Sequence, residues 1–500
     1  MSLLHPPGGE VTGSDAAPPP DLGLDRVAAA LLAGRGEFHL DAWFNAPLRT
    51  VEAVEYRQEA MRDLERPEVR DAAREFTAGL GGVRSRLGGA RSFEHPVQRN
   101  AALLDAALTY TGTVATFAER LSGVHPTSRA LTALADHLQS IATSPAFTGL
   151  AEDAAEARAA VAGITYRLHL STDRVQVSAP TGQETDYSAV IEAVFERFRQ
   201  GSIRSHVGRT TEHTGMNHLE AAIAERVATL YPDRFELLDR FAARHRDFVD
   251  PSLLTLDAEL QFLLVGLSLA DRLRAMSLPA CWPVVSGTDR TIELVSARDP
   301  ALALAHRDAV ANDVLLAAGE RIAVITGPNQ GGKTTFARMI GAITHLAALG
   351  FPVPAERARL PLPDAVLTHF GRAEDLADLR GALEDDLVRL RDILDAATAD
   401  SLVILNELFS STTVADAEQL SRATLERLVE RGCRCLWVTF LTELAETPGV
   451  VSLVSQVDPD DPGVRTFRVL RQDPGGPTWA ETLAVAAGLD RAGLRRRLSP

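Results

Sequence analysis

One lysine occurs in this 500-residue chain, Lys333, within the sequence Gly-Pro-Asn-Gln-Gly-Gly-Lys-Thr of residues 327–334. Every other basic side chain among the 51 Lys plus Arg residues is an arginine. Lys333 stands at a position where arginine cannot readily replace lysine, because a loop that wraps phosphates needs a compact ammonium group on a flexible stem. In the pattern G-x-x-x-x-G-K-T, backbone N–H groups surround the phosphates and the Thr hydroxyl ligates Mg²⁺. The segment therefore predicts a site for ATP with Mg²⁺.

The segments on either side of this loop have the required character. Residues 321–326 read as a short buried strand, and residues 334–348, rich in Ala, Leu, Ile and Met, read as a helix. A helix that begins at the loop directs its free N–H groups at the phosphates. The residues predicted to contact the nucleotide are Gly327, Pro328, Asn329, Gln330, Gly331, Gly332, Lys333, Thr334 and Thr335.

A second segment could supply the catalytic and metal-side groups. Residues 401–405 read as a buried strand that ends in Asn406-Glu407. In a P-loop ATPase, a strand of this kind ends in Asp-Glu. The Asp holds the Mg²⁺ hydration shell, and the Glu orients the attacking water. We therefore expect Glu407 and Lys333 to be catalytic, and Thr334 and Asn406 to lie at the metal. The neutral amide of Asn406 neutralises less charge than a carboxylate does.

Composition places limits on the remaining functions. Hydrophobic residues make up 45% and charged residues 24%, as in ordinary globular proteins, and no apolar run or signal pattern predicts contact with a membrane. Three cysteines, at 281, 433 and 435, fit reduced thiols in the cytoplasm, and no structural metal site is expected. The net charge of −16 repels nucleic acid, so any DNA contact must come from a local basic surface.

The pattern of the chain predicts an α plus α/β protein. We expect a disordered tail over residues 1–23, rich in Pro and Gly, and a mostly helical core over 24–285. Two alternating segments near 165–178 predict a hairpin, part of a clamp-like insertion near 160–210. Residues 286–500 alternate short strands with helices, which is typical of a P-loop NTPase domain with a parallel sheet.

The loop and several other stretches resemble the MutS family of DNA mismatch-repair ATPases. The resemblance is specific over about 290–495 and looser over about 36–285, where the helical core would lie. The similar stretches are 40–48, 57–60, 297–300, 310–313, 326–335, 402–413, 438–444 and 482–489. The resemblance implies a helical lever and clamp joined to an ATPase domain of MutS/ABC-like type that forms a homodimer around nucleotide. It also implies that the chain binds double-stranded or branched DNA.

The chain departs from that family at several positions. Only a short tail precedes the core, so we expect the mismatch-recognition and connector domains to be absent and mismatches not to be read directly. Asn406 replaces an Asp, Phe440 stands where the family has a His, and Gly381 lies near the family's Ser that contacts the partner subunit's nucleotide. We therefore expect nucleotide binding to survive and hydrolysis to be slow. Asp416 either compensates for the missing carboxylate or starts a helix, and we favour the helix.

Four arginines form the best candidate for DNA contact. They cluster within about a dozen residues of sequence and follow the predicted hairpin, where a clamp would contact phosphate: Arg197, Arg199, Arg204 and Arg209. The alternative is a solvated arginine-rich loop. DNA binding would place the protein at the nucleoid.

Two functions remain open. One is a slow DNA-associated ATPase that acts as a dimeric clamp in repair or recombination, and Glu407 favours it because a scaffold needs no general base. The other is a non-hydrolysing, nucleotide-dependent dimeric scaffold for protein partners, which the departures at Asn406, Gly381 and Phe440 favour. An ABC or SMC-type ATPase is disfavoured because no Leu-Ser-Gly-Gly sequence follows the loop.

Overall fold

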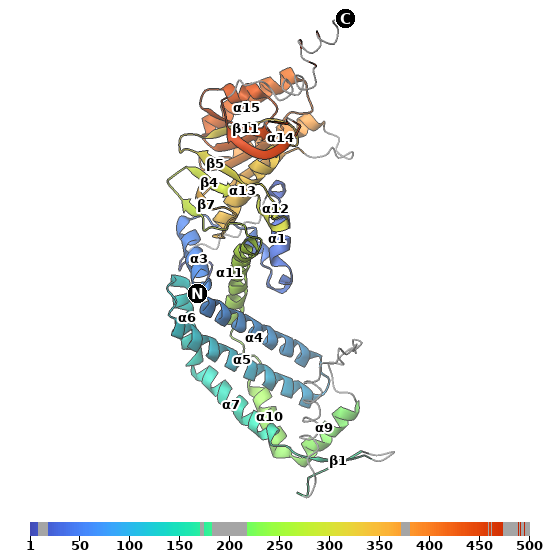
Figure 1. The fold of residues 1–500 in the computed structure, drawn as a ribbon. Helices are drawn as coiled ribbons and strands as arrows, with labels where there is room; N and C mark the ends of the chain where they lie inside the picture. Colours follow the sequence, from blue (N-terminus) through green and yellow to red (C-terminus); the bar gives the residue numbers. More distant parts are fainter. Residues whose placement is uncertain are drawn as a thin grey trace. The chain divides into compact units, whose positions relative to one another are not determined.

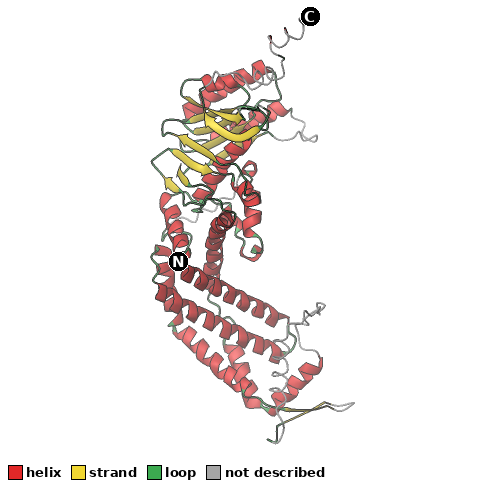
Figure 2. Cartoon of the chain, in the orientation of Figure 1, coloured by secondary structure: helices red, strands yellow, loops and turns green. Residues whose placement is uncertain are grey.

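The computed structural model separates the chain into two compact units (Figures 1 and 2). One unit comprises residues 66–126 and 132–257, and the other comprises 1–65, 127–131 and 258–500. The protein is a mixture of helices and sheets, in agreement with the predicted α plus α/β class. The structure describes residues 1–8, 19–170, 175–182, 218–371, 381–458, 460–461, 463–473, 489, 491 and 495.

The described residues of the first unit form long helices and a hairpin. Its elements are α4 (Pro67–Ser92), α5 (Pro96–Val124), most of α6 (Arg129–Ala142), α7 (Pro145–Ala162), β1 (Arg167–Leu170), β2 (Val175–Ser178), α9 (His218–Leu230) and α10 (Pro232–Arg244). Phe76 of α4 stacks on Phe117 of α5 with ring centroids 4.4 Å apart, which anchors the largest helix pair of the unit. β1 and β2 pair antiparallel, so the hairpin predicted near 165–178 is confirmed.

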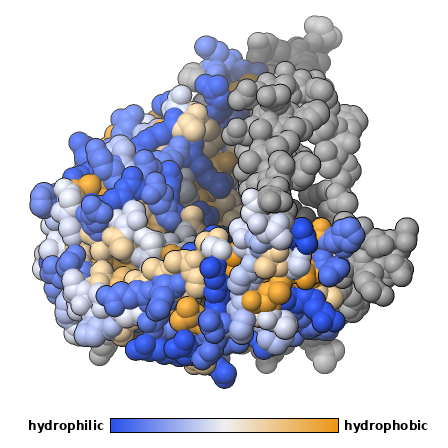
Figure 3. Space-filling model, turned by 90° about the horizontal axis from the view of Figure 1, so that it is seen from below, coloured by the Kyte–Doolittle hydropathy of each residue, from blue (hydrophilic) through white to orange (hydrophobic). Residues whose placement is uncertain are grey.

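Seen from below, the described surface is mostly hydrophilic, and hydrophobic residues gather on it only in small groups (Figure 3). That distribution is ordinary for a protein surface in water.

The second unit begins with the N-terminal segment. Its first helices are η1 (Pro20–Leu22), α1 (Leu24–Leu32), η2 (Gly36–Phe38), α2 (Asp41–Phe44) and α3 (Val51–Leu64). The expectation of a disordered tail over 1–23 is wrong for the described part, because Leu3 and Leu4 are fully buried. The backbone N–H of Leu3 donates to Glu259 Oε2 at 2.7 Å, and Ser2 Oγ donates to Oε1 at 2.6 Å. Two adjacent leucines and a buried carboxylate thus hold the segment, despite the Pro and Gly residues that follow it.

Helix α11 (Pro251–Ala275) forms the centre of this unit's helical part. Contrary to expectation, it is long and apolar enough to cross a membrane by length and composition alone. However, 72% of its apolar window is buried inside the protein, as in a core helix. Leu260, Phe262 and Leu263 are completely buried there. Because α3 and most of α11 cluster with the C-terminal region, the division between the units does not fall at the expected boundary of 285/286.

Two sheets follow α11 in the second unit. The six-stranded sheet has the order β12-β11-β6-β10-β9-β8, and the four-stranded sheet has the order β3-β7-β4-β5. Strands β11, β6, β10, β9 and β8 are parallel, as expected for alternating strands and helices, whereas β12 runs antiparallel to β11. The strands are β3 (Val284–Ser286), β4 (Ile292–Ala297), β5 (Asn312–Leu316), β6 (Ile322–Thr326), β7 (Arg357–Pro361), β8 (Val366–Phe370), β9 (Leu402–Asn406), β10 (Arg434–Val438), β11 (Val450–Val457) and β12 (Arg465–Arg471). The helices are α12 (Pro300–Ala305), α13 (Lys333–Ala348), α14 (Ala382–Ala396), α15 (Val414–Arg431) and η3 (Thr442–Glu446).

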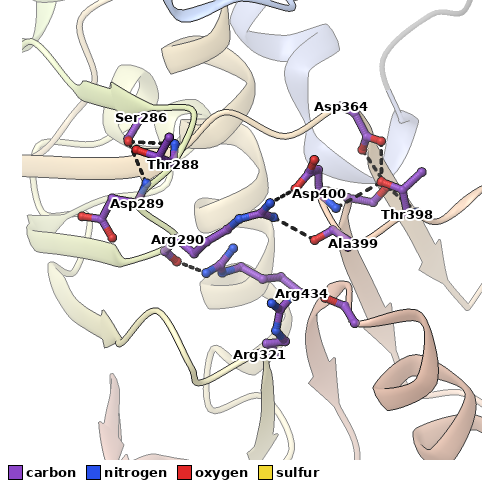
Figure 4. Close-up of polar contacts among 12 residues, drawn as sticks. Ser286, Thr288, Asp289, Arg290, Arg321, Asp364, Thr398, Ala399, Asp400 and Arg434 are labelled. Carbon is purple, nitrogen blue, oxygen red and sulfur yellow. Dashed lines mark hydrogen bonds and ion pairs between the residues drawn. The ribbon is translucent and has the colours of Figure 1, made fainter.

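A network of arginines fixes the edge of the six-stranded sheet where its parallel strands begin (Figure 4). Arg290, from the β3–β4 turn, pairs with Asp400 and donates to the carbonyl oxygen of Ala399 at 2.9 Å. The side chain of Arg434 donates to the carbonyl oxygen of Arg290. Burial, with the nearby Arg290 and Arg321 guanidinium groups, lowers the pKa of Arg434 to about 10. The network attaches the smaller sheet to the larger one at the edge opposite the carboxyl ends of β6 and β9.

Candidate nucleotide site

The glycine loop connects the end of β6 to the first residue of α13. Gly327 (φ 117°) and Gly332 (φ 90°) adopt backbone conformations that a residue with a side chain rarely adopts. The loop also packs closely on β11: a Cβ at Gly327 would lie 2.9 Å from the carbonyl oxygen of Ser455. Ser455 Oγ donates to the carbonyl oxygen of Gly331 at 2.6 Å and holds the loop on the sheet. The loop shape is therefore set by glycines and by one serine of a neighbouring strand.

Lys333 folds back onto this loop. Its side chain is buried, and Nζ donates to the carbonyl oxygens of Gly327 at 2.9 Å and Pro328 at 3.0 Å. Asn329 Oδ1 lies at 3.5 Å, at the limit of a hydrogen bond. Burial lowers the pKa of Lys333, the Glu407 carboxylate opposes that shift, and Arg465 adds to it. The ammonium group is thus held by neutral carbonyls, where a phosphate oxygen would be a stronger acceptor.

Thr334 and Asn406 meet although 72 residues separate them in sequence. Thr334 Oγ1, in the first turn of α13, donates to Asn406 Oδ1 at the end of β9 with a distance of 2.8 Å. A hydroxyl and an amide oxygen at this edge are hard oxygen ligands, suited to Mg²⁺ that keeps several waters and binds phosphate as well. The donor set therefore fits a Mg²⁺-nucleotide, with one carboxylate fewer than usual.

Glu407 follows directly, with its side chain exposed to the same pocket. Its backbone adopts a left-handed conformation (φ 54°), which is uncommon for a residue with a side chain. Its N–H donates to the carbonyl oxygen of Val438 on β10 at 2.8 Å. The neighbouring strand therefore fixes the point from which the carboxylate extends.

These groups surround a pocket of about 400 Å³. Its apolar wall comprises side chains from three parts of the unit and offers a surface for a planar base. The lining residues are Asp299, Leu302, Ala309, Val310, Asn312, Gln330, Gly331, Gly332, Lys333, Thr334, Thr335, Phe336, Met339, Glu407 and Phe467.

Reasoning from sequence missed Phe467 and Asn312 as site residues. Asn312 Nδ2 donates to the carbonyl oxygen of Phe467 at 3.2 Å, and Oδ1 accepts from the N–H of Val469 at 2.8 Å. This pair of bonds holds β12 and its exposed Phe467 ring beside the pocket. The only available signal was the stretch 310–313, already noted as a resemblance, which contains both Asn312 and the pocket residue Val310.

Other residues that the sequence singled out for a functional role lie away from the pocket or outside the residues that the structure describes. Asp416 Oδ2 accepts from Thr413 Oγ1 at 2.7 Å, and Thr413 Oγ1 accepts from the N–H of Asp416, so this acid belongs to the N-cap of α15 as we favoured. Gly381 precedes α14 without a capping side chain, and the Phe440 ring is 46% exposed after β10. The four arginines proposed for DNA contact, residues 372–380 and all but the last residue of the similar stretch 482–489 lie outside the described residues.

Comparison with known proteins shows similarity over the part of the chain that contains this loop. Residues 323–460 match the family model described as MutS domain V. The DNA mismatch repair protein MutS of Thermotoga sp. (strain RQ2) is 37% identical over 155 residues, which cover 31% of this chain and 20% of that protein. The MutS protein of Symbiobacterium thermophilum is 34% identical over 216 residues, 42% of this chain and 23% of the relative. That of Aquifex pyrophilus is 33% identical over 191 residues, 37% of this chain and 22% of the relative.

The matched part of the chain thus spans only about a fifth of the length of these relatives. It includes Lys333 and Glu407, which line one pocket, and Asn406, whose side chain accepts a hydrogen bond from the pocket residue Thr334. The match to domain V and these partial identities show that the part of the chain around the pocket is similar to domain V of the MutS family.

Proposed function

We propose that this protein binds ATP with Mg²⁺ in the pocket beside the glycine loop and hydrolyses it slowly to ADP and phosphate, as a P-loop NTPase of MutS/ABC-like type. The observation that carries the proposal is the position of Lys333, with Nζ held 2.9–3.0 Å from two loop carbonyls. A buried ammonium group is costly unless it is paired with charge. A triphosphate entering the loop would supply that charge.

The side chains around the loop would divide the work among them. Lys333 and the loop N–H groups bind and orient the phosphates, and Thr334 with Asn406 holds the Mg²⁺ end of the nucleotide. The apolar wall, including Phe467 and Val310, receives the base. Glu407 orients a water molecule in line with the terminal phosphate and accepts its proton. When bound, Mg²⁺ supplies charge neutralisation at the phosphate oxygens.

Slow turnover follows from the groups at the end of β9. The buried amide of Asn406 accepts the Thr334 hydroxyl hydrogen bond as a carboxylate would, but it carries no charge. Glu407 is therefore the one carboxylate among the described residues that line the pocket near the metal position, because Asp299 is already paired with Arg338 at 2.8 Å. We expect weaker stabilisation of the metal and its water without loss of nucleotide affinity.

We further propose that the protein acts on DNA as a dimer through its ATPase unit. This is supported by its MutS relatives, which are named DNA mismatch repair proteins. In this proposal the chain forms an ATP-driven clamp on duplex or branched DNA in repair or recombination, located in the cytoplasm at the nucleoid, and does not itself read mispairs. The net charge of −16 means that DNA contact must be local and sensitive to salt.

The decisive experiment measures ATP binding and steady-state hydrolysis for the wild type, Lys333→Ala and Glu407→Gln. Glu426→Gln, at an exposed position on α15, is the matched control. Lys333→Ala should weaken ATP binding at least tenfold, since each charge-assisted hydrogen bond contributes about 1.5–3 kcal/mol. Glu407→Gln should retain binding and lower turnover by about 10²-fold. Unchanged ATP affinity in Lys333→Ala would refute the nucleotide site.

The same assay, repeated with duplex and branched DNA at low and high salt, tests the DNA proposal. Turnover that depends on Glu407 and changes with DNA supports a DNA-coupled ATPase. ATP binding with no turnover above Glu407→Gln favours the second candidate, a non-hydrolysing dimeric scaffold, which the neutral Asn406 also favours. No DNA binding at low salt in the presence of ATP would refute the DNA part of the proposal.

A further inference from the structure

A buried histidine and an acid lie behind the pocket, and no role described above uses them. His369, on β8, is completely buried, and its Nε2 lies 3.3 Å from Asp386 Oδ1 on α14. The contact is within ion-pair distance, and neither ring nitrogen has a hydrogen-bond partner among the described residues. A buried imidazole with no satisfied nitrogen is costly, so the presence of the Asp386 carboxylate beside it requires an explanation.

The other oxygen of Asp386 points to the segment that carries Glu407. Asp386 Oδ2 accepts a hydrogen bond from the backbone N–H of Phe409 at 3.3 Å. Phe409 is two residues after Glu407, its ring is fully buried, and its backbone is left-handed (φ 60°) like that of Glu407 (φ 54°). Two such residues in a span of three store strain that surrounding contacts must offset.

Contacts with β10, with α14 and with the hydrophobic core hold this short segment in place. The N–H of Glu407 is bonded to the carbonyl oxygen of Val438, and the buried ring of Phe409 packs in the core. Asp386 supplies the polar contact at the far end of the segment. His369 sits in the register position opposite Leu405, directly before Asn406 and Glu407. The histidine and the acid therefore approach the Glu407 segment from two elements, β8 and α14.

We propose that His369 and Asp386 are positioning residues for Glu407: Asp386 holds the backbone at Phe409, and His369 fixes the Asp386 carboxylate from behind. Neither side chain lines the pocket, so both act through the backbone. This inference rests on the proposed hydrolysis for its effect on turnover, whereas its effect on the backbone does not depend on nucleotide.

The test compares four variants of the full chain with the wild type. Asp386→Ala removes the acceptor, Asp386→Asn keeps one acceptor oxygen, and His369→Phe keeps an aromatic ring of similar size without nitrogen. Asp385→Ala, at the adjacent half-buried acid on the same helix, is the matched control.

The first measurement is hydrogen–deuterium exchange of the peptide covering 406–412 without nucleotide. Loss of one hydrogen bond should accelerate exchange about three- to tenfold in Asp386→Ala and less in Asp386→Asn. The exchange rate of the 406–412 peptide should not change in Asp385→Ala, and that of a peptide covering 450–457 should not change in any variant. Unaltered exchange at 406–412 in Asp386→Ala overturns the inference, whatever the turnover of the wild type.

The second measurement is kcat and the Kd for ATP. Asp386→Ala and His369→Phe should lower kcat about five- to tenfold with Kd changed less than twofold, because Glu407 acts on the water and not on binding. A purely structural pair would lower Tm without altering kcat, and that result also overturns the inference. If the wild type shows no turnover that depends on Glu407, the proposed hydrolysis fails and the exchange experiment alone decides the positioning role.

Discussion

Asn406→Asp is the most informative single substitution in this chain, because it changes charge with almost no change in shape. Asn406 Oδ1 already accepts the Thr334 hydroxyl at 2.8 Å, and a carboxylate can accept the same bond. Asn406 is only 8% exposed, so the new charge would lie in a largely dry position. The variant therefore isolates the contribution of one charge at the metal side of the pocket.

The expected size of the effect follows from geometry. Mg²⁺ binds oxygen at about 2.1 Å, and a water-mediated carboxylate lies about 4 Å from the ion. A charge of −1 at that distance attracts Mg²⁺ by about 2 kcal/mol in water and by about 8 kcal/mol at an effective dielectric constant of 20. Burying the carboxylate removes several kcal/mol of that gain. We expect a net gain of about 1–2 kcal/mol, or about tenfold tighter Mg²⁺ binding.

The assay is a Mg²⁺ titration of ATP hydrolysis with Asn406→Ala as the control that removes the acceptor. Asn406→Asp should lower the Mg²⁺ concentration at half-maximal rate about tenfold and raise kcat, while Asn406→Ala should raise that concentration. Without Mg²⁺ and ATP, the Asp variant should unfold at lower temperature, because the buried charge is then unpaired. If neither variant alters the Mg²⁺ dependence, Asn406 does not lie at the metal and the assignment of the β9 end is wrong.

Two further predictions concern the fold around the site. Burial lowers the pKa of His345, on α13, from 6.5 to about 4, so below pH 6.5 the unfolded chain binds a proton that the folded chain does not, and stability falls as pH falls to about 4. The pKa difference corresponds to a loss of about 3 kcal/mol in the free energy of unfolding. Urea unfolding at pH 7 and pH 4.5 should show most of this loss in the wild type and little of it in His345→Gln. An equal loss in both proteins would contradict the prediction. Gly266→Ala, in α11, should destabilise by about 1–3 kcal/mol, because its Cβ would lie 2.7 Å from Met61 Sδ and 2.9 Å from the Phe351 ring. The test compares the melting temperature of this variant with that of Gly149→Ala, where the new Cβ would have open space around it. Equal melting temperatures would show that the core residues rearrange to make room for the new Cβ.

Local sequence was sufficient for the parts of the site that lie close together along the chain. The loop around Lys333 and the strand ending in Glu407 carry their chemistry in spacing and residue type, and both segments adopt the expected elements. Phe467 could not be predicted in the same way. It reaches the pocket because Asn312, 155 residues earlier, bonds to the backbone of β12. Nothing in the composition of either segment encodes that pairing.

Tertiary packing also overrode local propensity elsewhere. Helix α4 contains several glycines, which lower helix propensity, yet it forms within the region predicted to be mostly helical. In the structure the glycines permit close packing: a Cβ at Gly79 would lie 2.3 Å from Thr113 Oγ1 on α5. The N-terminal leucines are a similar case, because their burial depends on Glu259 of α11, more than 250 residues away. Such contacts follow from the assembled fold.

The neutral amide at Asn406, in place of a carboxylate, should affect turnover and ATP binding differently. The groups proposed to bind phosphate, Lys333 and the loop, belong to β6 and α13, whereas the altered metal-side residue Asn406 belongs to β9. Weakening only the second set lowers kcat and leaves the Kd for ATP in place. The lifetime of the ATP-bound state is then limited by hydrolysis and lengthens in proportion, so a tenfold loss of kcat gives about a tenfold longer state. A protein of this kind serves better as a slow switch than as a rapid motor, and the Asn406→Asp variant should shorten that state by the factor by which it raises kcat.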